Sequence, residues 1–422
     1  MRPVKKSLIQ YYRMMKKLSI TVNLVRNIFL KGCFLYFFAF FAHQLNAQSN
    51  PDNGLIDAHF GKPTTFSSKD SSFSLGIGGR IQSMAETRYD LDAKKGVIDF
   101  YIRRMRLNFS GNAISQKFTY RIQLCFSQRD ISSDNSQVQN NLFLRDAMLY
   151  YSPNKHWRFG FGQTKTPGNR QRQTSSGNLQ FADRSNTNAL FTLERDKGFW
   201  IVNTIRTKKK AIFSNTLAIT SGEGRIVSDK TDGLCYTFRS EFLPFGEFKN
   251  SGDYIESDIF FEDKFKLSVA ASISINNRTS RVAGQLGEYL YNNQLADIFY
   301  YGADFMMKKK GWSFTGELYR RTSRNGISIN PTNPAKVNFV YSGTGLLLQT
   351  GYLFTKKDEF AVRYGFTNPD NHIEAYVPTA QEYLMAYSHY FFRHNLKLQT
   401  DFGYIKGVQR NLQWRFTGIV TF

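Results

Sequence analysis

Arginine residues alternate with apolar residues in IDFYIRRMRLNF, the segment over residues 98–109. Successive side chains of a strand point to opposite faces, so Arg104 and Arg106 share one face if Met105 lies on the other. Arg121, in the next alternating segment, falls on the same face as these two arginines. The planar fork of an arginine binds phosphate and carboxylate oxygens in pairs and stays charged at neutral pH. The chemistry available to these three side chains is therefore the binding of small anions.

A second basic group lies in the longest stretch without a strand pattern, from Thr164 to about Asp196. Residues 162–186 of this stretch read GQTKTPGNRQRQTSSGNLQFADRSN. Its cationic side chains are Lys165, Arg170, Arg172, Arg184 and Arg195, against the acids Asp183, Glu194 and Asp196. An excess of fixed positive charge raises the local concentration of anions. We therefore expect the first four of these cations to belong to the same anion pathway as the three arginines above.

Residue patterns typical of enzymes are absent from the sequence. It contains no HExxH zinc motif, no CxxC pair and no GxSxG nucleophile turn. The histidines beyond residue 47 are His59, His156, His372, His389 and His394. We expect His389 and His394 to lie at an interface and not to bind a metal. The sequence predicts no catalytic residue, no metal site and no cofactor, and a hydrolase on the outer rim of a barrel is an alternative that no residue pattern favours.

Alternation of apolar and polar residues is the main structural signal and predicts β-strands. In KFTYRIQLCFS, residues 117–127, every second residue from Phe118 to Phe126 is apolar, and the residues between them are polar or small. Aromatic residues make up 16% of the chain and prolines number only 10, which favours many half-buried strands over helices around a dry core. One face of each strand is therefore expected to be apolar and the other to contact water.

Scoring the whole chain by this alternation predicts sixteen strands, with ends fixed to within a few residues. They lie near residues 74–89, 98–110, 117–127, 143–152, 155–163, 197–206, 211–220, 232–242, 264–275, 298–308, 311–321, 344–354, 359–367, 380–390, 395–404 and 412–422. Strands of about ten residues suit a tilted crossing of a membrane, whereas strands of soluble sheets commonly have about five to six residues. A secreted soluble sheet protein is the alternative fold.

The connections between these segments alternate in length. The tight ones are NAISQ at 112–116, PNK at 153–155, TKKK at 207–210, TKKD at 355–358, and the turns at Lys309-Lys310 and Arg393-His394. Outer-membrane barrels have an even number of strands, short periplasmic turns and long outer loops. The pattern therefore predicts a closed barrel with long outer loops and short inner turns. The connection at 243–263 belongs to the inner turns but is longer than the others.

Inside a water-filled barrel, the inward face of the second and third strands would carry Arg104, Arg106 and Arg121 as a basic track. The same phase turns Arg103 outward, and an arginine facing lipid at mid-depth costs about 2–4 kcal/mol, so Arg103 must lie near an interface or at a bulge. Sixteen strands enclose a wide lumen. The third outer loop, at 164–196, is expected to fold into that lumen and line its narrowest point. Two alternatives are that the arginines only pair with lumenal acids and that the loop contacts lipopolysaccharide at the surface.

Two acids, Asp304 on the tenth strand and Glu317 on the eleventh, also fall on the inward face. They are expected either to anchor basic residues or to limit selectivity for anions. Of the 56 basic side chains, eight lie in the first 47 residues, which leaves 48 against 33 acids. Such a positive excess attracts anions, and export from the cell makes nucleic acid an unsuitable partner.

The first 47 residues have the pattern of a secretory signal peptide. They combine eight basic residues with no acid, an apolar run CFLYFFAFFA at 33–42, and LNA at 45–47 as a small-residue cleavage site. Residues 48–73 are polar and are expected to form a flexible periplasmic tail, followed by a barrel over residues 74–422. The last strand, LQWRFTGIVTF, ends on Phe422 and resembles the signal by which outer-membrane barrels are inserted.

The segment at 162–185 resembles the third-loop segment of the phosphate-selective porin O and P family. In the same order, RRMRLNFSGN (103–112), LRDAMLYYSP (144–153), RDKGFW (195–200), PFGEFKNSGDY (244–254) and GQLGEYLY (284–291) resemble its bacteroidete-type members. The resemblance implies a sixteen-stranded outer-membrane barrel, commonly trimeric, whose lumenal arginines and lysines line an anion pathway.

The matching motifs assign Arg104, Arg106 and Lys165 to that pathway, as the resemblance implies. After the dipeptide TP, this sequence has Gly168, Asn169 and Arg170 where the family often has a hydrophobic or acidic continuation. The resemblance therefore does not extend to the fine shape of the constriction or to specificity for phosphate.

The sequence thus predicts an all-β fold, a transmembrane antiparallel β-barrel of about 16 strands with a long third outer loop folded into the lumen. The predicted function is an outer-membrane porin for passive diffusion of small anions, with phosphate or polyphosphate favoured by the resemblance. Expected partners are inorganic anions such as phosphate, outer-membrane lipid and lipopolysaccharide, and further copies of the chain in a homotrimer. A weakly selective general diffusion porin is the alternative function.

Overall fold

A computed structural model describes residues 56–131, 143–225 and 233–422 of the protein. The predicted signal peptide, residues 1–47, and residues 48–55 of the predicted tail lie outside the described residues. No helix within the described ranges is long and apolar enough to cross a membrane.

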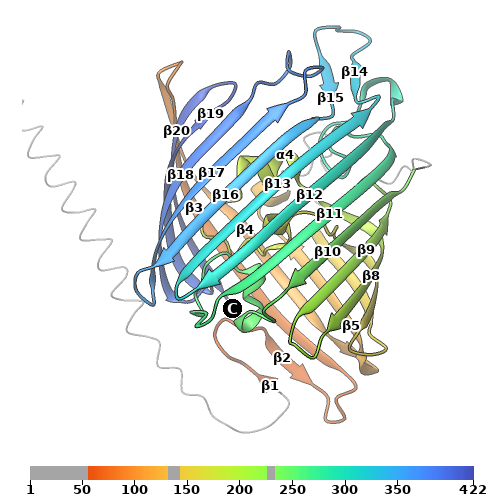
Figure 1. The fold of residues 1–422 in the computed structure, drawn as a ribbon, viewed down its shortest axis with the longest axis vertical. Helices are drawn as coiled ribbons and strands as arrows, with labels where there is room; N and C mark the ends of the chain where they lie inside the picture. Colours follow the sequence, from red (N-terminus) through yellow and green to blue (C-terminus); the bar gives the residue numbers. More distant parts are fainter. Residues whose placement is uncertain (1–55, 132–142, 226–232) are drawn as a thin grey trace, which may run out of the picture. The chain divides into compact units, whose positions relative to one another are not determined.

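The described residues form a closed antiparallel β-barrel of sixteen strands (Figure 1). Each barrel strand pairs with the next along the chain, and β20 pairs with β3 from Asn411 opposite Asp90 to Thr421 opposite Arg80, which closes the ring. The strands are β3 (Ser74–Asp90), β4 (Lys95–Ala113), β5 (Ser115–Cys125), β6 (Leu144–Tyr151), β7 (Trp157–Lys165), β8 (Arg195–Arg206), β9 (Ile212–Thr220), β10 (Cys235–Leu243), β11 (Lys266–Thr279), β12 (Ala296–Lys309), β13 (Trp312–Arg324), β16 (Gly343–Leu353), β17 (Asp358–Pro369), β18 (Ala380–Phe392), β19 (Leu396–Lys406) and β20 (Arg410–Thr421).

Each of the sixteen predicted segments overlaps one of these strands, so the predicted fold class is confirmed. The strand ends differ because hydrogen-bonded pairing continues beyond the apolar alternation. β4, for example, begins at Lys95 and not near residue 98, since Lys95 still pairs with Asp90 of β3. The first connection at the end of the barrel with the long loops is consequently short, at residues 91–94.

Two short strands precede the barrel within the predicted tail. β1 (Ile56–Asp57) pairs with β2 (Thr64–Ser67), and β2 pairs with the start of β3, where Thr64 lies opposite Ile77. The segment predicted to be flexible thus contains regular structure at these residues. The cause is local, because the β-branched and aromatic residues of TTFS suit a strand and the start of β3 offers unpaired backbone groups.

Side chains alternate across the barrel wall, with apolar ones outside and charged ones inside. In β17, Phe360 and Val362 are 48% and 42% exposed, whereas Glu359 and Arg363 are 1% and 3% exposed. A protein that is surrounded by water has the reverse distribution, because burial of charge away from water is costly. Exposed apolar residues around a polar interior are typical of a barrel that crosses a membrane.

The connections fall into two groups, one at each end of the barrel. One end carries the connections at 91–94, 126–143, 166–194, 221–234, 280–295, 325–342, 370–379 and 407–409, with the elements α2 (Gln128–Ile131), α3 (Arg170–Gln173), α4 (Asn186–Phe191), η3 (Tyr291–Asn293), β14 (Ile327–Ile329) and β15 (Val337–Phe339). The other end carries those at 114, 152–156, 207–211, 244–265, 310–311, 354–357 and 393–395, with η2 (Lys249–Tyr254). The connection predicted to be long for its class is therefore long in the structure.

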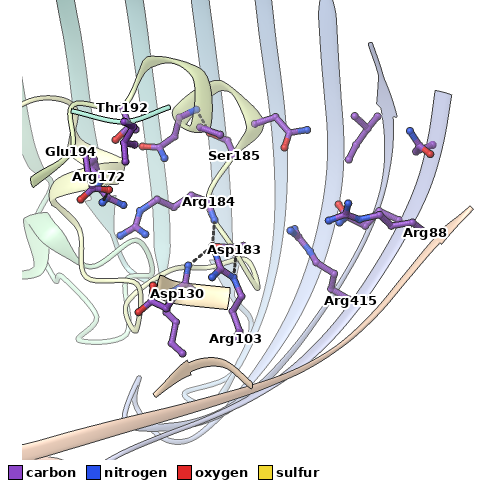
Figure 2. Close-up of a pocket in the computed structure, with 18 of the residues that line it drawn as sticks. Arg88, Arg103, Asp130, Arg172, Asp183, Arg184, Ser185, Thr192, Glu194 and Arg415 are labelled. Carbon is purple, nitrogen blue, oxygen red and sulfur yellow. Dashed lines mark hydrogen bonds and ion pairs between the residues drawn. The ribbon is translucent and has the colours of Figure 1, made fainter. Parts of the chain in front are cut away.

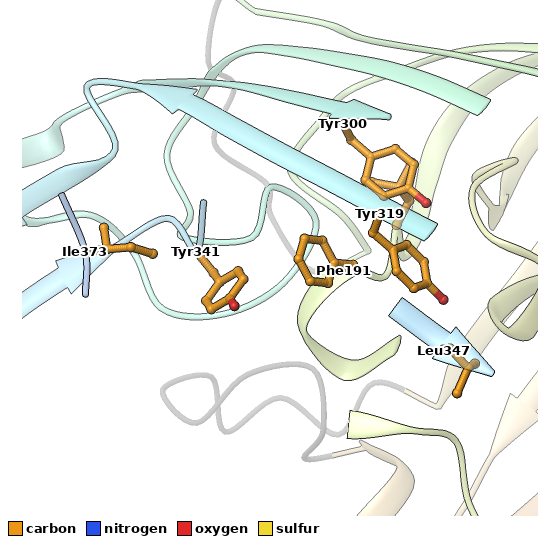
Figure 3. Packing of buried hydrophobic residues seen from close by; sticks show 7 residues of the cluster. Phe191, Tyr300, Tyr319, Tyr341, Leu347 and Ile373 are labelled. Carbon is orange, nitrogen blue, oxygen red and sulfur yellow. The ribbon is translucent and has the colours of Figure 1, made fainter. Parts of the chain in front are cut away.

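An apolar cluster fixes α4 to the wall of the barrel (Figure 3). The Phe191 ring stacks on Tyr319 with 5.2 Å between ring centroids and meets Tyr341 edge-on at 5.4 Å. Gly345 of β16 leaves room for this ring, because a Cβ at that position would stand 2.6 Å from Phe191. The end of the 166–194 connection is thus packed against β13 and β16.

The close approach of β4 to the start of β3 depends on Gly111, where a Cβ would stand 1.8 Å from the carbonyl oxygen of Ser74. We expect Gly111→Ala to force the strands apart and to lower the free energy of unfolding by about 1–3 kcal/mol. Urea unfolding in detergent micelles measures the change. Gly407→Ala is the control, because a Cβ there would make an ordinary 3.4 Å contact with Ala380. Equal stability of the two variants would contradict the close approach.

Candidate functional site

A bulge in β4 determines where its arginines point. The register of β3 and β4 shifts between Gln82 and Ser83, which leaves Arg103 as an extra residue in the ladder. Arg104 and Arg106 point into the barrel and are buried. Arg103, which strict alternation would turn toward lipid, is also directed inward by the bulge. The cost of an arginine facing lipid requires Arg103 to lie near an interface or at a bulge, and the structure has the bulge.

Asp183, in the connection between β7 and β8, binds two of these arginines. Arg104 Nη2 donates to one carboxylate oxygen and Arg103 Nε to the other, each at 2.6 Å (Figure 2). Burial acts to raise the pKa of Asp183, but Arg104 and Arg103 outweigh it and hold the pKa well below its ordinary value. The carboxylate therefore stays ionised, and one negative charge is shared by two positive charges.

Asp130 of α2 is shared in the same way. Arg106 donates from Nε and Nη2 to its two carboxylate oxygens at 2.6 and 2.7 Å, and Arg145 of β6 lies 3.3 Å away. Burial acts to raise the pKa of Asp130, but Arg106 and Arg145 outweigh it and hold the pKa well below the usual range. Glu194 likewise contacts Arg172 and lies 4.0 Å from Arg145. Glu194 also accepts from Arg195 Nη1 at 3.1 Å, so each acid serves at least two arginines.

Arg170 is more completely paired than the other predicted cations. It donates from Nε to Asp304 at 2.8 Å and from Nη2 to Glu241 at 2.7 Å. Burial acts to lower the pKa of Arg170, but Asp304 and Glu241 outweigh it and raise the pKa. Glu317 accepts from the backbone N–H of Gln171 at 2.6 Å. The two inward acids expected from the sequence, Asp304 and Glu317, therefore anchor the β7–β8 connection.

Lys165 and Arg184 are held by backbone carbonyl groups instead of acids. Both donate to the carbonyl oxygen of Thr174, at 3.4 and 2.7 Å. Among the residues that the structure describes, no carboxylate lies within 4 Å of either cationic group. Burial and the neighbouring charge of Arg104 lower the pKa of Arg184 to about 9. An anion that approached Arg184 would oppose this lowering of the pKa, because an opposite charge favours the charged form.

Two cavities inside the barrel carry these side chains. Cavity one has a volume of 560 Å³ (Figure 2), and its charged lining residues are Arg88, Arg103, Arg104, Arg106, Arg145, Arg172, Arg184 and Arg415 with Asp130, Asp183 and Glu194. Cavity two has a volume of 410 Å³, and its charged lining residues are Arg106, Arg121, Arg158, Lys165, Arg195 and Arg239 with Asp146 and Glu241. Arg106 lines both cavities, so the two adjoin at this residue. Cations outnumber carboxylates in each of them.

The predicted site residues divide between these cavities. Cavity one takes Arg104, Arg106, Arg172 and Arg184, and cavity two takes Arg106, Arg121 and Lys165. Arg170 lines neither of the two, because Asp304 and Glu241 occupy its guanidinium group. The structure thus places six of the seven predicted residues on the cavity walls and gives the seventh an anchoring contact.

The sequence model of the phosphate-selective porin O and P family matches residues 75–412, which is most of the chain. The chain belongs to this family. No curated relative matches the sequence of this porin.

Solved structures share the fold of this porin at low sequence identity. The anion-selective porin from Comamonas acidovorans has a TM-score of 0.52 at 10% identity and covers 83% of this chain and 100% of its own. OmpF of Salmonella typhi, solved with daunomycin, has a TM-score of 0.52 at 12% identity, with 85% and 100% covered. The outer-membrane channel DcaP of Acinetobacter baumannii has a TM-score of 0.50 at 12% identity, with 85% and 99% covered. At these identities the likeness concerns the fold alone, and with the family it identifies an outer-membrane channel.

Several basic residues of the porin interior were not predicted. Alternation could have found Arg415, because its neighbours Trp414 and Phe416 are apolar and point outward or half outward. It could not have found Arg145, which is the extra residue at a register shift between Leu144 and the buried Asp146. Arg80 of β3 is another basic residue that was not predicted. Its Nη2 donates to Ser176 at 2.7 Å. A Cβ on Gly177 would stand 2.3 Å from Arg80 Nη1, so a larger residue at position 177 requires this arginine side chain to move.

A connection from the opposite end of the porin barrel, residues 244–265, meets the β7–β8 connection. Glu256 accepts hydrogen bonds from Gln171 Nε2 at 3.3 Å and from the backbone N–H of Gln180 at 2.9 Å. Gln349 of β16 donates to the same carboxylate at 2.9 Å. Glu256 therefore ties the two connections to each other and to the barrel wall.

Lys308 of β12 holds the 244–265 connection in place. Its ammonium group donates to the carbonyl oxygens of Gly252, Ile255 and Ser257 at 2.7, 2.6 and 2.7 Å. All three N–H donors of one buried lysine are thus used on a single segment.

We expect Lys308→Met to leave three carbonyl groups without this donor. Each carbonyl group that water does not reach should lower the stability of the protein by about 1–3 kcal/mol. The loosened connection should make the single-channel conductance in planar bilayers larger and noisier. Lys309→Met is the matched control, because the side chain next to Lys308 is exposed. A Lys308→Met channel with the conductance and noise of the unaltered protein would show that the lysine does not hold the connection.

Proposed function

We propose that this porin passes small anions across the outer membrane, with phosphate as the favoured solute. The observation that carries the proposal is the lining of cavity one, where eight arginines face three carboxylates. Arginine binds phosphate oxygens through pairs of N–H groups and does not lose its charge near neutral pH. The description of the family, phosphate-selective porins, agrees with an anionic solute.

The proposal includes a constriction formed by the β7–β8 connection across the lumen. This connection bonds to opposite parts of the wall. Ala182 accepts from Gln82 of β3 at 3.0 Å and donates to Asp401 of β19 at 2.9 Å, while Arg170 reaches Asp304 of β12. A segment lying over one outer rim of the barrel could not contact β3, β12 and β19 together. These contacts support a position inside the lumen, with the narrowest part near Arg106, where the two cavities adjoin.

Shared carboxylates suit a channel better than a tight binding site. At about 4 Å and an effective dielectric constant near 20, a pair of unit charges is worth about 4 kcal/mol before desolvation is subtracted. Asp130 and Asp183 each offset part of the charge of two arginines, so a passing anion meets several shallow sites in series. Conduction requires this arrangement, because a deep site would hold the anion and block flow.

We further propose export through the signal peptide at residues 1–47, assembly into a homotrimer, and contact with outer-membrane lipid and lipopolysaccharide. The pattern of the leader supports export, and the resemblance to the family implies the trimer. The exposed apolar side chains of the outer wall, such as Phe360 and Val362, support contact with lipid.

The alternative, a weakly selective general diffusion porin, is favoured by one observation. Many interior arginines stand next to a carboxylate, and Arg170 contacts two. If such pairing extended through the passage, its net charge would be small. The excess of arginines in cavity one favours anion selectivity over this alternative.

We expect the channel to prefer chloride over potassium in a planar bilayer under a KCl gradient. Arg184→Gln should reduce the preference, because this cation lines cavity one and its removal leaves no carboxylate without a partner. A unit charge at about 4 Å is worth about 1 kcal/mol in water-like surroundings, so a fall of up to about fivefold is expected. The reversal potential measures it. Arg206→Gln, outside both cavities and paired with Glu247, is the control. A reversal potential near zero for the unaltered channel would favour the general diffusion porin.

Phosphate should compete with chloride for the arginines of the passage. We expect added inorganic phosphate to lower the chloride current at concentrations well below that of chloride, because one phosphate accepts paired hydrogen bonds from arginine and one chloride does not. The current is measured at constant ionic strength, with sulfate as the comparison anion. A phosphate effect no stronger than that of sulfate would remove phosphate as the favoured solute and leave the anion passage in place.

A further inference from the structure

Three side chains stand where cavity two meets a further cavity of 490 Å³. Arg121, Tyr150 and Arg158 line both cavities. The guanidinium group of Arg158 lies over the Tyr150 ring, 4.4 Å from its centroid. Arg121 is half exposed, and its guanidinium group is 3.8 Å from Asp146. The junction therefore presents an aromatic ring between two arginines, near the end of the barrel that carries the 152–156 turn.

The wall beside this junction is apolar, although it faces the interior of the barrel. Strand register places Tyr150, Gly160, Trp200 and Ala218 in one row across β6, β7, β8 and β9. Large and small residues alternate along the row, and Tyr150 packs against the buried part of it. Val202 continues the apolar surface into cavity two. The inner face of a water-filled barrel is ordinarily polar, so this row differs from the wall of cavity one.

Arginine and apolar surface lie side by side at this junction. Arg158 pairs in the strand register with Val202, one row away from Tyr150 and Trp200. No carboxylate of the described residues lies within 4 Å of Arg158, whose charge is matched only by the face of an aromatic ring. An inorganic anion can use the two arginines of this junction. It cannot use the ring of Tyr150 or the side chain of Val202.

We propose that this junction binds organic anions that carry a flat apolar group beside a phosphate headgroup. The phosphate oxygens accept hydrogen bonds from Arg121 and Arg158, and the flat group lies along Tyr150 and Val202. Contact between aromatic groups is worth about two- to tenfold in affinity beyond the contribution of the headgroup. The inference rests on the proposed function, because it adds a class of solute to an anion passage. The solute fits, since each of the adjoining cavities measures several hundred Å³.

Phenyl phosphate and inorganic phosphate test the site through their effect on chloride current in planar bilayers at about pH 8, where both are largely doubly charged. We expect phenyl phosphate to half-block the current at a concentration about two- to tenfold lower than inorganic phosphate. Tyr150→Ser should abolish that difference, whereas Tyr150→Phe should retain it. Tyr151→Ser is the matched control, because this neighbouring tyrosine points outward and stacks on Phe118.

Equal half-blocking concentrations for the two anions in the unaltered channel would overturn the proposal. So would a preference for phenyl phosphate that survives Tyr150→Ser. Arg158→Gln should weaken block by both anions, since it removes a contact to the headgroup. The reversal potential of the same channels separates the two proposals. Anion selectivity without a preference for phenyl phosphate would contradict only the site at this junction. A preference for phenyl phosphate without anion selectivity would contradict only the proposed function.

Discussion

The pairing of β20 with β3 is the constraint on which the other features of the protein depend. Hydrocarbon offers no hydrogen-bond partners, so every backbone N–H and C=O group in the wall must bond to a neighbouring strand. The closing pair continues to the last residue, where Gly79 and Phe422 exchange two backbone hydrogen bonds of 2.6 and 2.9 Å. Once the ring is closed, strand alternation directs each side chain either to lipid or to the interior. A charged residue inside then needs only water or a nearby partner, and a dense population of arginines becomes tolerable.

Closure of the ring also determines which charged residues the strands contribute and which the connections contribute. Most of the arginines of cavity one lie on strands, where the backbone ladder fixes their height and direction. The three carboxylates of that cavity, Asp130, Asp183 and Glu194, lie in connections. The charge balance of the passage is therefore set by how the connections dock onto the wall. A change that displaces a connection alters both the width of the passage and its charge.

The sequence contains enough to predict the strands, because alternation with period two is a local property that each strand displays independently. It also predicts that Arg104 and Arg106 point inward and that Arg103 lies near an interface or at a bulge, since the cost of a charge in lipid excludes the opposite phase. It does not reveal which acid meets which arginine. Asp130 and Asp183 are separated from their partners by some 15 to 80 residues of sequence, and their approach depends on loop conformations that have no periodic signal. An anchoring role for Asp304 was one of two expectations, but its pairing with Arg170 could not be predicted for the same reason.

Two cations of the β7–β8 connection have different surroundings, because the acids of the wall lie near one of them and not near the other. Arg170 faces β10 and β12, whose inward residues include Glu241 and Asp304, and both acids bind it. Arg184, fourteen positions later, faces cavity one, where Arg104 and Arg106 add to its charge. The acids of one part of the wall therefore fasten the connection, while the arginines of the β3–β4 part remain beside open volume. The connections from the two ends of the barrel meet at Glu256, which is also bonded to Gln349 of β16, and the two cavities lie along the arginine-rich part. The uneven distribution of acids around the ring thus accounts for the excess of cations over carboxylates in the two cavities.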